Sequence, residues 1–254
     1  MRVIKINRKT LLFYAVVIIL SLIVVSNQER VSSVIAKNLK PIYSVKTDAP
    51  QIAITFDISW GEENVLPILE ILKAENIKAT FFLSSPWAEK KPELVKAIIA
   101  GGHEIGSHSR RHVDLNKLSE AELGKELDMS KEVLEKLSGQ KIDLLRPPNG
   151  AYDNQVISVA NARGYHVIQW SVDSLDWKRP GADAIINYVI NGRSKNKGAS
   201  PGAIILFHAS DSAPDTPKAL STIIKTLKAK NYALVSVGVL LKNAEESWPP
   251  GSSL

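Results

Sequence analysis

The chain has 254 residues, 44% of them hydrophobic, and a formal net charge of +6. This length and apolar content suffice for one sizeable domain with its own core. The absence of cysteine excludes disulfide bonds, thiolate metal sites and a cysteine nucleophile.

The basic excess is concentrated at the N-terminus. Residues 1–25 contain four basic residues and no acidic one, and the rest of the chain holds 28 basic against 26 acidic residues. An excess that small, without lysines and arginines clustered between aromatic residues, argues against a nucleic-acid partner. A nucleic-acid or membrane-surface binder is therefore the least favoured functional hypothesis.

The N-terminus has the pattern of a membrane-targeting segment. A cationic start precedes the apolar run LLFYAVVIILSLIVV at residues 11–25, which predicts a signal peptide or a short signal-anchor over residues 1–26. The run is shorter than the roughly 20 residues that span a bilayer comfortably. No clear cleavage site follows it, so we favour an uncleaved anchor over a cleaved signal. A buried core helix is disfavoured because the run is apolar on all sides and follows four basic residues.

This segment also predicts where the protein resides. The basic flank should stay in the cytoplasm, which places the domain outside. The expected location is the cell membrane, as a single-pass protein, or the exterior if the signal is cleaved. Residues 27–44 are expected to form a linker.

From residue 45 to 243, short apolar runs rich in β-branched residues alternate with amphipathic segments. Predicted strands lie at 51–56, 78–84, 103–107, 143–146, 165–172, 202–208 and 232–237. Predicted helices lie at 63–74, 92–100, 119–137, 153–162, 182–190 and 216–229. This alternation predicts a parallel α/β sheet, and seven such units predict a deformed or incomplete (β/α)7-8 barrel. A doubly wound open sheet is the alternative, and residues 244–254 are expected to be a disordered tail.

Five chemically useful side chains follow predicted strands, namely Asp57, His108, Arg146, Asp173 and His208. Taken alone, each has a structural alternative as a helix cap, a turn residue or a buried histidine. The strand C-termini of a parallel barrel open on one face, where active sites are assembled. We therefore expect the five side chains to converge on one cleft, whereas His103 and His166, near strand starts, are expected to be structural.

The stretch HSRRH at residues 108–112 has two interpretations. Histidines four residues apart on a helical turn project from one side and can hold one cation, and imidazole suits zinc and related divalent metals. Alternatively, they are only two polar residues on a helical turn. Their placement after a strand, on the face that carries Asp57 and His208, favours a metal site. Catalytic zinc usually takes three protein ligands, so a third ligand is missing from this pattern.

At these residues the chain resembles the polysaccharide deacetylases, the NodB-homology or carbohydrate esterase 4 family, over about residues 45–243. TFDISWG resembles the first family motif, HSRRH matches the second, RPPNG resembles the third, DSLDW the fourth, and LFH matches the fifth, in the family's order. The wording of several motifs also resembles the PdaB-like branch, which is associated with sporulation. The resemblance implies a deformed (β/α) barrel and metal-dependent removal of N-acetyl groups from amino-sugar polymers, such as peptidoglycan or chitin-like glycans.

The resemblance also implies residue roles. Asp57 matches the general base and His208 the general acid, with Arg146 and Asp173 as residues that orient and tune them. His108 and His112 match ligands of a divalent metal, for which zinc is expected and cobalt or manganese are alternatives. The implied substrate-binding residues are Pro148, Asn149, Trp177 and Leu206. A monomer is expected.

Two positions depart from the family pattern. Ile58 replaces the second aspartate of the first motif, which is a metal ligand, and Asn149 replaces the tyrosine of the third motif. Isoleucine cannot bind a metal, so we expect a weakened but usable site. The sequence thus favours an exported N-deacetylase and leaves open a glycan-binding protein on the same fold with degenerate catalysis.

Overall fold

The computed structural model of the chain describes Tyr14, Val17, residues 39–194 and residues 196–247. Its contacts divide the chain into two units, Met1–Lys40 and Pro41–Leu254, and the second holds the fold described below. Apart from Tyr14 and Val17, the predicted membrane segment at 1–26 lies outside the described residues, as does most of the predicted linker. Over the part of the chain that is described, no helix is both long and apolar enough to cross a membrane.

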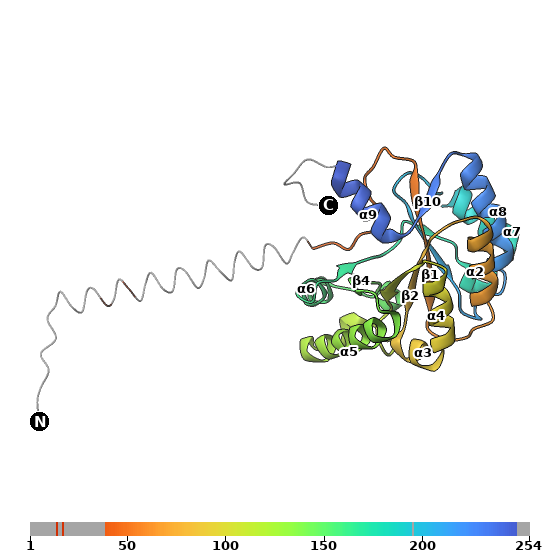
Figure 1. Ribbon diagram of the computed structural model, residues 1–254. Coiled ribbons are helices and arrows are strands. Elements are labelled where there is room, and N and C mark those ends of the chain that lie inside the picture. Colours follow the sequence, from red (N-terminus) through yellow and green to blue (C-terminus); the bar gives the residue numbers. More distant parts are fainter. Residues whose placement is uncertain (1–13, 15–16, 18–38, 195, 248–254) are drawn as a thin grey trace, which may run out of the picture. The chain divides into compact units, whose positions relative to one another are not determined.

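A parallel sheet of eight strands forms the centre of the fold (Figure 1). Its strands are β1 (Gln51–Ile58), β2 (Thr80–Leu83), β3 (Glu104–Ser107), β4 (Leu144–Leu145), β5 (His166–Val167), β6 (Val172–Asp173), β9 (Ile204–His208) and β10 (Ala233–Val235). β1 is central: β9 pairs with one edge, while β10 and β2 share the other. A short antiparallel hairpin, β7 (Gly192–Arg193) and β8 (Asn196–Lys197), stands apart from this sheet.

The sheet curls into an incomplete barrel. The strand order is β5-β4-β3-β2-β1-β9-β6, so the two edge strands, β5 and β6, follow each other in the chain. The segment 41–45 lies in the gap, where Ile42 pairs with Ile168 and Ser44 pairs with Ala203. This arrangement agrees with the predicted deformed barrel and not with a doubly wound open sheet.

At the gap in the barrel, the structure differs from the predicted strand at 165–172. The apolar run 165–172 was expected to be a single strand, but it forms β5 and β6 with a break between them. Gln169 N–H donates to the Ile42 carbonyl (2.8 Å) and Ser171 N–H donates to the Ile204 carbonyl (3.1 Å). The chain therefore crosses from the β4 edge to the β9 edge within this run, which no single straight strand can do.

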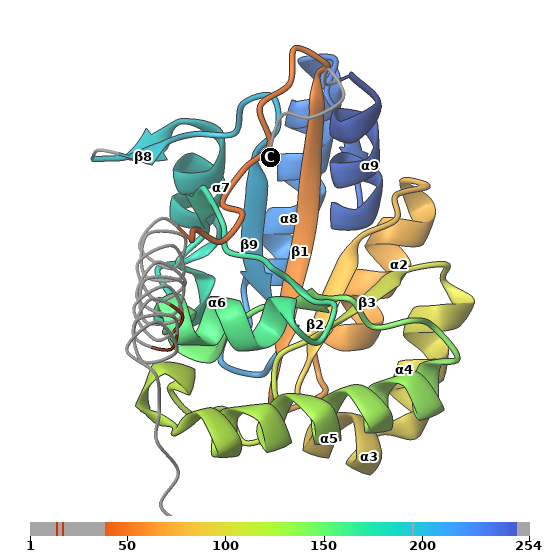
Figure 2. The same ribbon diagram turned by 90° about the vertical axis from the view of Figure 1, so that its left-hand side faces the viewer.

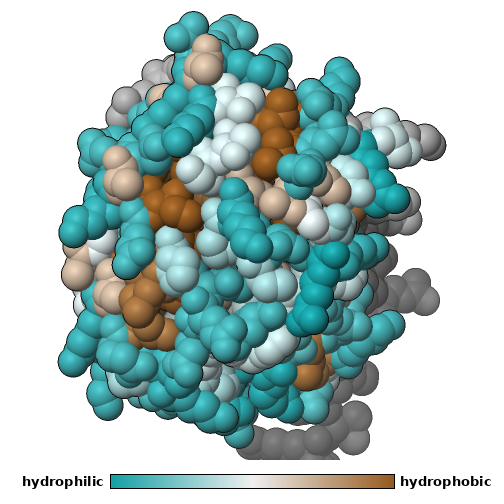
Figure 3. All heavy atoms as spheres, turned by 90° about the vertical axis from the view of Figure 1, so that its right-hand side faces the viewer, coloured by the Kyte–Doolittle hydropathy of each residue, from teal (hydrophilic) through white to brown (hydrophobic). Residues whose placement is uncertain are grey.

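Helices surround the curled sheet (Figures 1 and 2). They are α2 (Val65–Ala74), α3 (Ser85–Lys90), α4 (Pro92–Ala100), α5 (Glu120–Ser138), α6 (Asn154–Asn161), α7 (Ala182–Ile190), α8 (Thr216–Ala229) and α9 (Val237–Ser247). α8 shows why they form, since its buried residues Leu220, Ile223, Ile224 and Leu227 repeat at helical spacing. α5 begins with a capping box formed by Ser119 and Glu122. The face covered by α2, α7 and α8 is mostly hydrophilic with scattered hydrophobic patches (Figure 3).

The sequence pattern does not predict α3 or α9. α3 has only six residues, and α9 begins with Val-Gly-Val, which disfavours a helix. Tertiary hydrogen bonds hold the start of α9 instead: Val237 N–H donates to Thr80 Oγ1 (2.8 Å), and Gly238 N–H donates to the Glu104 carboxylate (3.0 Å). α9 extends through Ser247, so residues 244–247 of the predicted tail are helical, and residues 248–254 lie outside the described residues.

Successive side chains of each strand point to opposite faces of the sheet, and this alternation defines an outer and an inner layer. On the outer face, the Phe56 ring stacks on the rings of Phe81 and Phe207, and Ser107 Oγ contacts Ser130 Oγ of α5 at 3.0 Å. On the inner face, a buried apolar cluster joins the strands to α9; it includes Ala53, Phe82, Leu144, Ile204, Val237, Leu240 and Leu241. The strand starts are thus filled with apolar residues, which leaves the polar residues at the strand ends.

Candidate active site

A cavity of about 590 Å³ opens at the C-terminal ends of the strands, and most of the predicted site residues line it. The lining residues are Asp57, Trp60, His108, His112, Pro147, Asn149, Gly150, Trp170, Asp173, Trp177, Leu206, His208 and Ser212. Arg146 lies fully buried beside Asp57. Pro148 does not line the cavity, whereas its neighbour Pro147 does.

Asp57 and Arg146 form a buried pair beneath this cavity. Arg146 Nη1 donates to Asp57 Oδ1 (2.8 Å) and to Thr55 Oγ1 (2.8 Å), and Arg146 Nη2 donates to the Gln169 carbonyl (3.1 Å). Burial raises the pKa of Asp57, but the Arg146 charge and the nearby His108 and His208 outweigh it and lower that pKa below its ordinary value. Asp57 is therefore an ionised carboxylate whose Oδ2 is not held by Arg146.

His108 is oriented by the backbone of Arg146. Its Nδ1 lies 2.8 Å from the Arg146 carbonyl, so Nδ1 carries the proton and donates, and Nε2 presents a lone pair. Nε2 lies 3.7 Å from Asp57 Oδ2. Burial lowers the pKa of His108 to about 4, which keeps the ring neutral near pH 7. A neutral imidazole whose other nitrogen is anchored is the form that binds metals.

The HSRRH stretch is a loop and not the helical turn that the spacing predicts. Ser109 and His112 have positive φ angles of 63° and 52°, which a right-handed helix excludes. The His108 and His112 rings nonetheless lie with centroids 5.2 Å apart. The two imidazoles meet, as predicted, through a different backbone conformation.

One buried carboxylate on α5 holds this loop. Glu126 Oε1 accepts from Ser109 Oγ (3.0 Å), Arg110 N–H (3.1 Å) and Arg111 N–H (2.6 Å), and its Oε2 accepts from Arg111 Nε (2.7 Å). Burial raises the pKa of Glu126, but these bonds outweigh it and the pKa is lowered. Positive φ at non-glycine residues costs energy, and Glu126 compensates by binding every residue between the two histidines. Nothing in the spacing of the sequence points to this residue.

Ile58 faces away from the cavity. It pairs with Leu83, Leu83 pairs with Ser107, and paired residues of neighbouring strands share a face. Ser107 points to Ser130 of α5, so Ile58 belongs to the outer layer, where it is fully buried. The position that the motif resemblance assigns to a metal-binding aspartate is therefore a core position here.

The donor set fits a divalent metal only in part. His108 and His112 offer two imidazoles, and Asp57 offers a carboxylate that Arg146 already binds. Among the described residues, no group of three or more histidine, cysteine, aspartate or glutamate side chains is arranged to hold a metal ion. The predicted two-histidine site is brought together, without a complete third ligand.

His208 pairs with Asp176 and not with the predicted Asp173. His208 Nδ1 lies 2.7 Å from Asp176 Oδ1, and His208 N–H donates to Asp176 Oδ2 (2.7 Å). Thr216 Oγ1 also donates to Oδ2 (2.7 Å). Burial lowers the pKa of His208, but the hydrogen bond and charge of Asp176 outweigh it and raise that pKa. The sequence contained a signal for this residue, since Asp176 is the acid directly before Trp177 in DSLDW.

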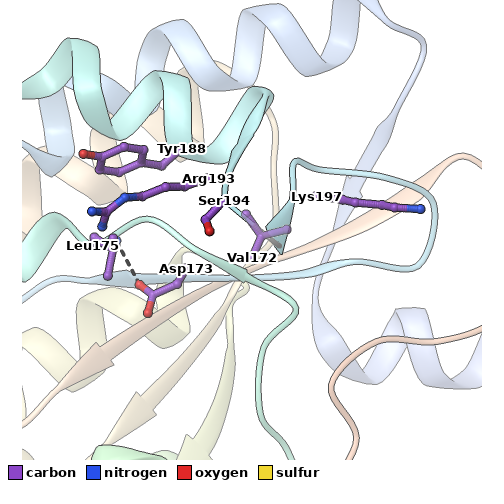
Figure 4. A pocket seen from close by; sticks show the side chains of 7 residues that line it. All are labelled: Val172, Asp173, Leu175, Tyr188, Arg193, Ser194 and Lys197. Atoms are coloured by element: carbon purple, nitrogen blue, oxygen red, sulfur yellow. Dashed lines mark hydrogen bonds between the residues drawn. The ribbon is translucent and has the colours of Figure 1, made fainter.

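Asp173 lines the main cavity but accepts a hydrogen bond from Leu175 N–H (2.8 Å). Burial raises its pKa. It also lines a smaller cavity of about 240 Å³ with Tyr188, Arg193 and neighbouring residues. Figure 4 shows the Arg193 guanidinium beneath the Tyr188 ring, whereas Lys197 points away from the other side chains. Asp173 therefore belongs to the wall between two cavities, and its role is not to bind His208 directly.

Leu206, Asn149 and His103 are the remaining predicted positions to locate. Leu206 pairs with Thr55 one layer below the pair Asp57 and His208 and is almost fully buried. Asn149 has a φ of 57°, a conformation that asparagine tolerates better than most residues, and its Nδ2 donates to Asp114 Oδ1 (2.8 Å). His103 is buried, and its Nδ1 accepts from Ala79 N–H (3.2 Å), which agrees with the structural role expected for it.

Comparison with known proteins identifies the class. The family model described as polysaccharide deacetylase matches residues 44–168. The chain is 35% identical over 198 residues to a peptidoglycan-N-acetylglucosamine deacetylase of Bacillus cereus, covering 77% of this chain and 70% of that protein. It is 34% identical over 202 residues to the uncharacterized protein YlxY of Bacillus subtilis, covering 80% of this chain and 60% of YlxY.

Solved structures of similar proteins belong to the same class. BA3943 of Bacillus anthracis, described as a CE4 family pseudoenzyme, matches with a TM-score of 0.74 and 33% identity, covering 81% of this chain and 70% of that one. A mutant of BA3943 with restored enzymatic activity matches with the same TM-score. The chain belongs to the polysaccharide deacetylase, or carbohydrate esterase 4, family.

Proposed function

We propose that this chain is an exported, metal-dependent hydrolase that removes N-acetyl groups from amino-sugar polymers, with peptidoglycan as the expected substrate. One observation carries the proposal: Asp57, the two histidines and His208 line one cavity. Arg146 holds Asp57 and His108, Asp176 holds His208, and the His112 ring lies against the His108 ring. Core packing alone does not require such a set of ionisable groups at one end of a barrel.

The base half of the reaction belongs to Asp57. Arg146 binds Oδ1 and keeps the carboxylate ionised, while Oδ2 remains to take a proton from water. The water oxygen then bonds to the acetamide carbon and gives a tetrahedral oxyanion, for which a backbone N–H in the third-motif loop near Asn149 is the proposed donor. Leu206 supplies an apolar surface at the cavity floor for the acetyl methyl group.

His108 and His112 would hold the metal, with zinc expected and cobalt or manganese as alternatives. A divalent cation there would polarise the acetamide carbonyl and make water more acidic. Because Ile58 supplies no donor, we expect weak binding.

The acid half belongs to His208. Its Nδ1 is bound by Asp176, so Nε2 is the nitrogen free to act. The raised pKa keeps the ring protonated to higher pH, and Nε2–H then protonates the sugar nitrogen as the carbon–nitrogen bond breaks. Acetate and a free amine result.

A single-pass membrane anchor at residues 1–26, an extracytoplasmic domain and a sporulation role complete the proposal. They rest on the cationic and apolar pattern of the N-terminus and on the resemblance to the PdaB-like branch. A monomer is proposed, with no nucleic-acid partner.

A glycan-binding protein without turnover is the second candidate. Two observations favour it: Ile58 is a core residue, and the described residues contain no complete metal-ligand set. The similar BA3943 is described as a pseudoenzyme, so this family contains such proteins.

Acetate release distinguishes the two candidates. The full-length chain would be chelated, supplied with zinc, cobalt or manganese, and incubated with peptidoglycan and with chitin oligomers, beside a His108→Ala variant. Release that the metal restores and His108→Ala lacks supports the hydrolase. If a folded protein binds glycan equally with and without metal and releases no acetate, the binding protein is correct.

A further inference from the structure

Two tryptophans are exposed at the rim of the main cavity. Trp60 exposes 54% of its surface and Trp177 exposes 49%, and both line the cavity. Trp87, by contrast, is buried, and its Nε1 donates to the Gly61 carbonyl (2.7 Å). Large apolar side chains left in water beside a cavity are a common feature of ligand sites.

The loop that carries Trp60 is held in a fixed conformation. Asp211 Oδ1 accepts from the backbone N–H groups of Glu62 (2.8 Å) and Glu63 (2.9 Å). Gly61 has a φ of +79°, and a Cβ on it would lie 2.4 Å from Asp211 Oδ1, so only glycine permits this approach. The exposed indole thus sits on a rigid support and not on a loose loop.

The loop that carries Trp177 is tied to the same segment. Trp177 N–H donates to Asp176 Oδ1 (2.8 Å). Arg179 Nε donates to the Ser212 carbonyl (3.1 Å), and its Nη2 donates to the Asp211 carbonyl (3.4 Å). Both tryptophan loops are therefore anchored on the residues that follow β9, and their separation is fixed by the fold.

The strand order places the two tryptophan-bearing loops after strands that flank β9. β9, which ends at His208, lies between β1, which precedes Trp60, and β6, which precedes Trp177. The two outer strands are two inter-strand spacings apart, about 10 Å. Loops that leave two strands so far apart can offer contacts to sugar rings on either side of the reaction centre.

We propose that Trp60 is a second sugar-binding platform, which acts with Trp177 so that the cleft binds an internal stretch of an N-acetylated glycan across His208. A pyranose ring presents C–H groups on its flat face, and an indole offers a rigid apolar plane against which they are buried. This inference rests on the proposed glycan ligand, but it does not depend on the metal. It specifies an oligomer, in place of a single sugar or a chain end, as the ligand.

Isothermal titration of the full-length chain with N-acetylglucosamine and with its β-1,4-linked tetramer tests the inference. The variants are Trp60→Ala, Trp60→Phe and Trp177→Ala. Leu66→Ala is the matched control, because Leu66 is 51% exposed nearby on α2 and does not line the cavity. Thermal unfolding checks that each variant is folded.

We expect the tetramer to bind more tightly than the monomer, and each alanine variant to weaken the tetramer roughly tenfold or more. Monomer affinity should fall much less than tetramer affinity, and Trp60→Phe should retain most of the tetramer affinity. Tetramer binding by Trp60→Ala that equals that of Leu66→Ala overturns the inference and leaves the proposed function intact. A folded wild-type chain that binds neither sugar overturns both.

Discussion

The two halves of the cavity differ in how completely they are built. On the acid side, His208 and Asp176 are joined by two hydrogen bonds, and Thr216 donates a third to the same carboxylate. On the metal side, two imidazoles converge, but the position that the motif resemblance assigns to a third ligand is Ile58, a buried residue of the outer layer. The acid side is a closed network, whereas the metal side lacks a donor.

This difference shows that one half of a site can lack a donor while the other half keeps its partners. An unpaired polar group in a buried site is costly, so a disused acid network would be expected to become apolar. Here Asp57, Arg146, Asp176 and His208 keep their partners. The expected third ligand position, Ile58, packs in the outer layer, where isoleucine contributes to the core.

The largest effect is expected at the acid side, from Asp176→Asn. The variant removes the charge that raises the pKa of His208, so that pKa should fall. Activity that requires protonated His208 declines as pH rises through this pKa, so the decline should move to lower pH, and acetate release near pH 7 should drop by about 10²–10³-fold. Rate–pH profiles measure the shift, and NMR titration of the His208 ring measures it even where turnover is absent.

Asp173→Asn is the matched control, because Asp173 is near His208 but not bound to it. A small shift in the pKa of His208 is expected for that variant. Equal shifts in the two variants would contradict the assignment of Asp176 as the partner.

The next effect is expected at the metal side, from Ile58→Asp. Without metal, an unpaired carboxylate in the core should lower the free energy of unfolding by about 3–5 kcal/mol. With zinc or cobalt, the carboxylate can lower its cost only by turning toward His108 and His112, so the metal should stabilise this variant more than the wild type and bind it more tightly. Urea unfolding with and without metal measures both quantities.

Ile58→Asn separates charge from packing in this experiment. It also loses the isoleucine contacts but supplies a weaker metal donor, so its metal-dependent stabilisation should stay close to that of the wild type. If the aspartate variant gains no more from metal than the asparagine variant, the incomplete metal side does not result from residue 58.

The limits of the sequence have physical causes at particular residues. The parallel sheet, α4, α7, α8 and the convergence of Asp57, His108 and His208 could be predicted, because strand alternation and helical periodicity are local signals. The loop conformation of HSRRH could not be predicted, because Glu126 imposes it from a helix that follows the loop in the chain. The outward orientation of the Ile58 side chain likewise depends on strand register, which the pairing of Ile58 with Leu83 defines.

The smallest effect is expected from the support of the metal side, at Glu126. Glu126→Ala leaves the N–H groups of Arg110 and Arg111 without their acceptor and frees a loop with two positive φ angles. We expect a loss of metal affinity of about 10-fold, the lower end of the range for residues that orient ligands. Glu126→Gln keeps one acceptor oxygen, so its metal affinity should fall by less than that of Glu126→Ala. Titration with cobalt measures the affinity.

The role of Glu126 can also be measured without metal, so the test does not depend on how weakly the wild type binds the metal. The ring-proton chemical shifts of His108 and His112 depend on the contact between the two rings, so they should change in Glu126→Ala. Glu132→Ala, which removes an exposed carboxylate from the same helix, should leave both the shifts and the affinity unchanged. Unaltered ring shifts in a folded Glu126→Ala variant would mean that the histidines hold their places without the loop support, and the incompleteness of the metal side would then lie in residue 58 alone.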